Sequence, residues 1–160
     1  MKAPKWKTVR RTAAVLVLLT MAGCSTPPYQ QPPAGGTNAD TGQLVVDDIW
    51  VNGPKGLPAG GDAPLQLDIT NESATAGDTL VGVSTPIAQK VVLRQDGHVV
   101  SGISLPPSSN VDLEWQTGIQ LQGLRQKVAA GQYVPVTLTF AQAAPITTQV
   151  VAGPLAAPEQ

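Results

Sequence analysis

The strongest strand signal in the chain is the stretch Val134-Pro135-Val136-Thr137-Leu138-Thr139-Phe140. Apolar residues stand at every second position, with a proline or a threonine between them. This period of two places successive side chains on opposite faces of a strand, so one face is expected in a core and the other in water. Pro135 has no backbone N–H to donate, which predicts that the strand lies at a sheet edge or begins there.

Short segments of the same kind fill the rest of the chain. We expect further strands at residues 44–51, 65–70, 80–83, 90–94, 99–103, 111–115, 119–122 and 146–151. Turn-forming residues separate these segments, and Asp96-Gly97 predicts a two-residue hairpin. No segment shows a sustained helical period. The pattern therefore predicts an all-β fold, an antiparallel sandwich or barrel.

The N-terminal segment has the layout of an export signal. Five basic residues precede an apolar run at residues 13–19, and the small residues Ala22 and Gly23 then lead to the single cysteine, Cys24. The apolar run is too short for the roughly 20 residues of a membrane-spanning helix. The arrangement resembles the lipobox of bacterial lipoproteins, in which the peptide is cut before the cysteine and the thiol is acylated. The alternative is a free cysteine in an ordinary secretory peptide.

From this resemblance we expect residues 1–23 to be a signal peptide that is cleaved between Gly23 and Cys24. Cys24 would carry an acyl chain such as palmitate and hold the protein on the extracytoplasmic face of the cell membrane. The pair Arg10-Arg11 leaves open whether export uses the general or the twin-arginine route.

Removal of the leader changes the charge of the chain. The whole sequence has a formal charge of −1, whereas from residue 24 onward five basic residues face eleven acidic ones, a net charge of −6. An acidic domain is repelled by phosphate backbones, so we expect no nucleic-acid binding. Anionic lipid headgroups would not attract it either, so attachment to the membrane would depend on the lipid anchor at Cys24.

Composition divides the remainder of the chain. Residues 24–42 contain two Pro-Pro pairs, glycines and polar residues, which predicts a tether that holds a domain away from the membrane. Recognition of the Pro-Pro pairs by a partner domain is the alternative. The β-domain is expected at residues 43–154 and a short tail at residues 155–160.

Several strand-like phrases follow one another in a characteristic order between residues 47 and 151. They are Pro64-Leu65-Gln66-Leu67-Asp68-Ile69-Thr70-Asn71, Asp78-Thr79-Leu80-Val81-Gly82-Val83-Ser84-Thr85-Pro86, Ala88-Gln89-Lys90-Val91-Val92-Leu93, residues 118–124, and Gly131-Gln132-Tyr133 leading into the first strand above. This order resembles the PCu(A)C family of periplasmic copper chaperones, whose actinobacterial relatives include lipoproteins. The resemblance implies a Greek-key, cupredoxin-like β-sandwich that carries copper between extracytoplasmic proteins.

The resemblance also implies a copper site of His and Met side chains, with a late His-x-Met pair. The first His of this pattern falls on Arg94, and the late pair falls on Gly118 and Gln120. A Met expected near residues 99–101 is absent, and both methionines of the chain lie in the predicted leader. Cu(I) selects thiolate and thioether ligands and accepts imidazole. We therefore expect these family positions to be degenerate and no cofactor to be bound, with copper as the alternative.

The single histidine, His98, is the remaining candidate for a metal ligand, together with Asp96. One imidazole and one carboxylate make at most a weak site. Because both residues belong to the predicted hairpin, the competing interpretation is that they are ordinary exposed turn residues.

Enzyme chemistry finds little support in the sequence. No serine stands in a G-x-S-x-G elbow, and the carboxylates are scattered over strands and loops, as at Glu72, Asp78, Asp112 and Glu114. We predict no catalytic residues. Trp50 and Trp115 are expected in or beside the core, with stacking against a ligand as the alternative.

Together these features predict a membrane-anchored lipoprotein of the cell envelope with a copper-chaperone-like β-sandwich. It would act as a non-enzymatic binding or assembly component with an unidentified envelope protein as partner. The alternative is an extracytoplasmic copper chaperone whose site is non-standard or completed by a partner, and a third class is an envelope hydrolase.

Overall fold

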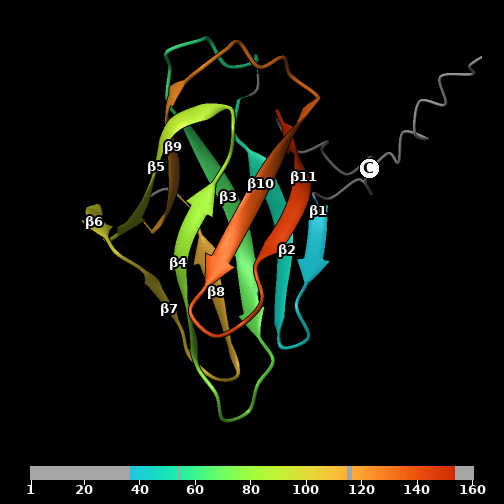
Figure 1. The fold of residues 1–160 in the computed structure, drawn as a ribbon, viewed down its shortest axis with the longest axis vertical. Coiled ribbons are helices and arrows are strands. Elements are labelled where there is room, and N and C mark those ends of the chain that lie inside the picture. The colour runs from blue at the N-terminus through green and yellow to red at the C-terminus, as the bar shows by residue number, and fades with distance from the viewer. Residues whose placement is uncertain (1–36, 54, 115–116, 154–160) are drawn as a thin grey trace, which may run out of the picture. The chain divides into compact units, whose positions relative to one another are not determined.

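Eleven β-strands form in the part of the chain that the structure describes, residues 37–53, 55–114 and 117–153 (Figure 1). The structure is a computed structural model. The strands are β1 (Thr37–Asp40), β2 (Leu44–Val51), β3 (Ala63–Asn71), β4 (Asp78–Ser84), β5 (Ala88–Gln95), β6 (His98–Val100), β7 (Ile103–Leu105), β8 (Ser109–Leu113), β9 (Gly118–Leu124), β10 (Gln132–Phe140) and β11 (Ile146–Ala152).

The strands pair into one sheet in the order β6-β5-β9-β3-β2-β11-β10-β4-β7, with β1 added to β2 and β8 added to β3. The two ends of this order, β6 and β7, are consecutive in the chain, so the sheet folds back on itself. Figure 1 shows β10 and β4 in front of β3 and β8, as the two layers of a sandwich. One apolar core lies between the layers, with Leu65, Ile69, Leu80, Leu121 and Leu138 among its fully buried residues. The all-β prediction is confirmed.

Strand β10 has the alternation that the sequence predicts. Its four apolar residues Val134, Val136, Leu138 and Phe140 are buried, while Thr139 is exposed. Its position differs from the expected edge, because β10 pairs with β11 on one side and, from residue 137 onward, with β4 on the other. Pro135 lies before the pairing with β4 begins, so its missing N–H interrupts no ladder there.

One strand pair departs from the antiparallel pattern. Strands β2 and β11 run parallel, with Trp50 opposite Val151 and Val51 opposite Ala152. The connection between two parallel neighbours must cross over the fold. Here the connection contains all the strands from β3 to β10, so the pair joins a strand near the start of the domain to its last strand.

The hairpin and the strand limits follow the sequence closely, with two differences. Asp96 and Gly97 both have positive φ, 51° and 79°, as a two-residue turn between β5 and β6 requires. The strand expected at residues 99–103 is two strands, β6 and β7, separated at residues 101–102. Strand β1 lies inside the predicted tether and pairs with β2, so residues 37–40 already belong to the sheet, ahead of the domain start predicted at residue 43.

The predicted leader and Cys24 lie outside the described residues. Among those that are described, no helix is long and apolar enough to cross a membrane.

The alternation along β10 leads to a stability prediction. Leu138 is 0% exposed, so Leu138→Ala should remove about 3 kcal/mol from the free energy of unfolding by creating a cavity in the core. The adjacent exposed Thr139 is the matched control, and Thr139→Ala should cost less than about 1 kcal/mol. Urea unfolding of both variants measures the difference, and equal losses would show that Leu138 does not face the core.

Candidate functional site

The three degenerate copper positions come together on one side of the sheet. Arg94 on β5 lies directly opposite Gly118 on β9, and Gln120 lies two residues further along β9, opposite Val92. These residues alternate with the core residues Leu93 and Ile119, so they belong to the face that points away from the core. The positions that the family resemblance assigns to copper ligands are therefore neighbours on one face, although the ligand types are absent.

A break in the pairing of β3 shapes this site. On one side β3 pairs with β9 at residues 63–65 and with β8 at residues 67–71, so Gln66 stands where the two partners change. Continuing the β3–β9 register by one residue would bring Gln66 beside Gly118. A cavity of 410 Å³ opens here, and Arg94, Gly118, Gln120, Gln66 and Glu114 are among the residues that line it.

Two buried polar atoms in this cavity have no hydrogen-bond partner among the described residues. Gln66 is only 4% exposed although it is on the outer face, and its Oε1 accepts no hydrogen bond. Arg94 donates from Nη1 to the Gly97 carbonyl oxygen at 3.1 Å, but its buried Nε–H has no acceptor. A buried polar atom without a partner costs about 1–3 kcal/mol. Two such atoms in one cavity mark a place where further hydrogen bonds can form.

The residues at the copper positions do not fit copper. The Arg94 guanidinium is a permanent cation without a free lone pair, Gly118 has no side chain, and the Gln120 amide is a hard ligand. Space is also missing, because a Cβ atom on Gly118 would lie 3.0 Å from the Glu114 carbonyl oxygen. A histidine at position 118 would require the backbone at Glu114 to move.

The other metal candidates lie on the hairpin beside this cavity. Asp96 and His98 are both exposed, and His98 pairs with Gln95 across the β5–β6 turn. Neither residue lines the cavity. Within the described part of the chain, no group of three or more His, Cys, Asp or Glu side chains is arranged to hold a metal ion.

A row of carboxylates crosses the same outer face. Asp47 on β2, Asp68 on β3 and Asp112 on β8 lie opposite one another in register. Burial, together with the negative charges of Asp112, Asp48, Glu114 and Asp47, raises the pKa of Asp68. The surroundings of the cavity are therefore negative, and its lining includes a single cation, Arg94.

Trp50 lies next to this region. It is half-buried on β2, opposite Gln66 on β3 and Val151 on β11. Directly opposed residues share a face of the sheet, so Trp50 covers the side of Gln66 away from β9. Trp115, the other tryptophan considered from the sequence, lies outside the described residues.

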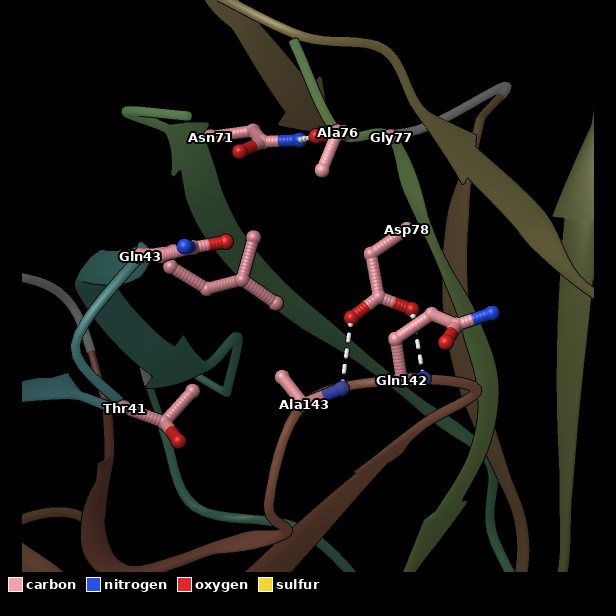
Figure 2. A pocket seen from close by; sticks show the side chains of 9 residues that line it. Thr41, Gln43, Asn71, Ala76, Gly77, Asp78, Gln142 and Ala143 are labelled. Carbon is pink, nitrogen blue, oxygen red and sulfur yellow. Dashed lines mark hydrogen bonds between the residues drawn. The ribbon is translucent and has the colours of Figure 1, made fainter. Parts of the chain in front are cut away.

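A second cavity, of 600 Å³, lies between the loops at one end of the sandwich (Figure 2). Figure 2 shows the Asp78 carboxylate directed at the backbone N–H groups of Gln142 and Ala143, which donate to it at 2.9 and 2.8 Å. Asn71 donates to the carbonyl oxygens of Ala76 and Leu105 at 2.9 and 3.0 Å. These polar groups already have partners within the protein, so they hold the loops together.

Comparison with known proteins supports this reading of the fold. The sequence profile of the LpqE-like lipoprotein family matches residues 44–152. The chain belongs to the LpqE-like family. A search of curated proteins finds no match to this LpqE-like chain.

Solved structures resemble the LpqE-like chain in fold. The copper-bound PCuAC domain from PmoF2 has a TM-score of 0.65 at 21% identity and covers 73% of this chain and 97% of its own. The apo PCuAC domain from PmoF1 has a TM-score of 0.65 at 22% identity and covers 74% and 100%. Apo-DR1885 from Deinococcus radiodurans has a TM-score of 0.51 at 18% identity and covers 89% and 96%. The predicted cupredoxin-like, PCuAC-type fold is thereby confirmed.

The carboxylate row leads to a pH-dependent prediction. As the pH rises, Asp68 ionises in the unfolded chain before it does so in the folded chain, so its charge destabilises the fold at neutral pH. Asp68→Asn should therefore stabilise the LpqE-like chain at pH 7 by about 0.5 kcal/mol, and the gain should vanish below the ordinary pKa of aspartate. Thermal unfolding at several pH values measures this, with exposed Asp40→Asn as control. A gain that grows at acid pH would contradict the assignment.

Asp78 should behave in the opposite way. Burial alone would raise the pKa of its carboxyl group, but N–H donors from Thr79, Ala143, Gln142 and Ala141 bring it below the ordinary value. Asp78→Asn should cost about 1–2 kcal/mol at neutral pH, and the difference from wild type should shrink as acid protonates Asp78 in the folded state. Exposed Glu72→Gln is the control. A loss that stays constant down to acid pH would show that the charge is not responsible.

Proposed function

We propose that this protein is a lipid-anchored component of the bacterial cell envelope. Membership of the LpqE-like lipoprotein family supports the proposal, as does the leader that ends at Cys24. Cleavage before Cys24 and acylation of its thiol would place the β-domain on the extracytoplasmic face of the membrane. The Pro- and Gly-rich residues that follow would separate the domain from the lipid surface.

Within the envelope, the domain acts as a non-enzymatic binding or assembly component. The observation that carries this proposal is that Arg94, Gly118 and Gln120, the positions that the family resemblance assigns to copper ligands, line one cavity together. A guanidinium and an amide are hydrogen-bonding groups, so the site is equipped for a polar organic ligand or a partner's polar groups. The partner is an envelope protein that the domain meets at this face.

The second candidate function is extracytoplasmic copper transfer. It is favoured by the fold shared with a copper-bound PCuAC domain and by the exposed His98, which lies on the same hairpin as Arg94. His98 and Asp96 would need ligands from a partner protein, because two side chains do not complete a tight copper site.

The anchor can be tested by replacing its attachment point. Cys24→Ala should move the protein from the membrane fraction to the soluble fraction of fractionated cells, because no acyl chain can be attached. Cys24→Ser is the matched control for side-chain size and should be released as well. Both variants should retain the thermal unfolding midpoint of the wild type. A Cys24→Ala protein that is cleaved yet still sediments with membranes would overturn the proposed anchor.

Copper titration separates the two candidate functions. The chain, purified in detergent from membranes, should take up no Cu(I) or Cu(II) beyond a control protein in competition with a chelator. The Cys24→Ala variant checks that a thiol does not contribute. Tight binding of one equivalent that is lost in His98→Ala would instead establish the copper-transfer function.

A further inference from the structure

We propose that the cavity bounded by Arg94, Gln66 and Glu114 binds a small ligand that carries a carboxylate next to a nitrogen donor. An α-amino acid has this chemistry, and so does the C-terminal residue of a peptide. The inference rests on the proposed binding function and names the class of ligand that the degenerate copper position would take.

Arg94 supplies the carboxylate-binding edge. Its Nη1 donates to the Gly97 carbonyl oxygen. Among the described residues, the buried Nε has no acceptor and no hydrogen bond is recorded for Nη2. These two nitrogens form one edge of the planar guanidinium, and two parallel N–H groups match the two oxygens of a carboxylate. A ligand carboxylate on this edge would satisfy the buried Nε–H that the folded protein leaves unpaired.

The same cavity also contains hydrogen-bond acceptors for a nitrogen donor on the ligand. Gln66 Oε1 is a buried acceptor that receives no hydrogen bond from the described residues, and Gln66 is only 4% exposed. The exposed residue Glu114 also lines the cavity, and the structure records no ion pair between it and Arg94. An amide N–H on the ligand would donate to Gln66 Oε1, and a ligand ammonium would in addition pair with the negative charge of Glu114, while the ligand carboxylate remains on Arg94.

The charges around the cavity and its volume further restrict the class of ligand. A simple anion would be opposed by the nearby Asp68, Asp112 and Glu114 carboxylates, whereas a simple cation would leave Arg94 unused. A ligand with both groups balances the single cation and the single anion of the lining. The volume of 410 Å³ lies at the lower end of the range of roughly 300–1,000 Å³ for small-molecule sites. That volume suits one amino-acid residue.

Isothermal titration of the full chain in detergent tests the proposal. The probes are the twenty L-amino acids, their N-acetyl derivatives, acetate and methylamine. At least one amino acid or N-acetyl amino acid should bind at one equivalent, and at least tenfold more tightly than acetate or methylamine. N-acetyl derivatives imitate a peptide C-terminus, so the set that binds more tightly identifies the source of the ligand. The proposal is overturned if no probe binds, or if acetate binds as tightly as the best amino acid.

Three substitutions then locate the site. Arg94→Gln should weaken binding of the best probe at least tenfold, while Arg125→Gln should leave it unchanged, because Arg125 lies outside the cavity and donates to the Ala88 carbonyl oxygen. Exposed Glu114→Gln should weaken binding of free amino acids and leave N-acetyl derivatives unaffected. Because Glu114 is exposed, this variant is informative even if Arg94→Gln fails to fold. Unchanged affinity in both Arg94→Gln and Glu114→Gln would overturn the assignment.

The outcome is separable from that of the proposed function. If no probe binds and copper does not bind either, the proposed amino-acid-type ligand is wrong, and the proposed role as a non-enzymatic binding component is unaffected. Tight copper binding would remove that proposed function itself.

Discussion

The arrangement of strands around β3 determines both the core and the candidate site. Leu65, Leu67 and Ile69 of this strand are buried in the core, while its outer face carries Gln66 and Asp68. On one side β3 pairs with β9 and then with β8, and the change of partner falls at Gln66. A buried polar side chain and a cavity result on a face that would otherwise be in water.

In this cupredoxin-like domain, the positions that the family resemblance assigns to copper ligands carry no histidine or methionine. Register places Arg94 opposite Gly118 on neighbouring strands. Thiolate, thioether or imidazole ligands at these positions would bind Cu(I). The Arg94 guanidinium and the Gln120 amide form hydrogen bonds instead, and Gly118 contributes no side chain. A Cβ atom on Gly118 would lie only 3.0 Å from the Glu114 carbonyl oxygen, so position 118 has little room for a side chain. Fold and function are therefore separable in this domain.

Much of the fold could be predicted because alternation is a local property. The strands around Leu67, Leu121 and Leu138 and the Asp96-Gly97 turn all follow from residues close in sequence. Gln66 could not be predicted as part of a site, since a polar residue between two leucines of an alternating strand is expected in water. Its burial and the parallel pairing of β2 with β11 depend on which distant strands become neighbours. The sequence pointed to this region only through the family resemblance, which assigns a ligand position to residue 94.

Residue-resolved NMR of the ¹⁵N-labelled full chain during titration with Cu(I) tests the central claim most directly. The claim is that the copper position of the fold now serves hydrogen bonding. The account predicts that one equivalent of Cu(I) leaves the backbone amide signals of Arg94, Gly118 and Gln120 unmoved. Shifts of these three signals that saturate at one equivalent would contradict it.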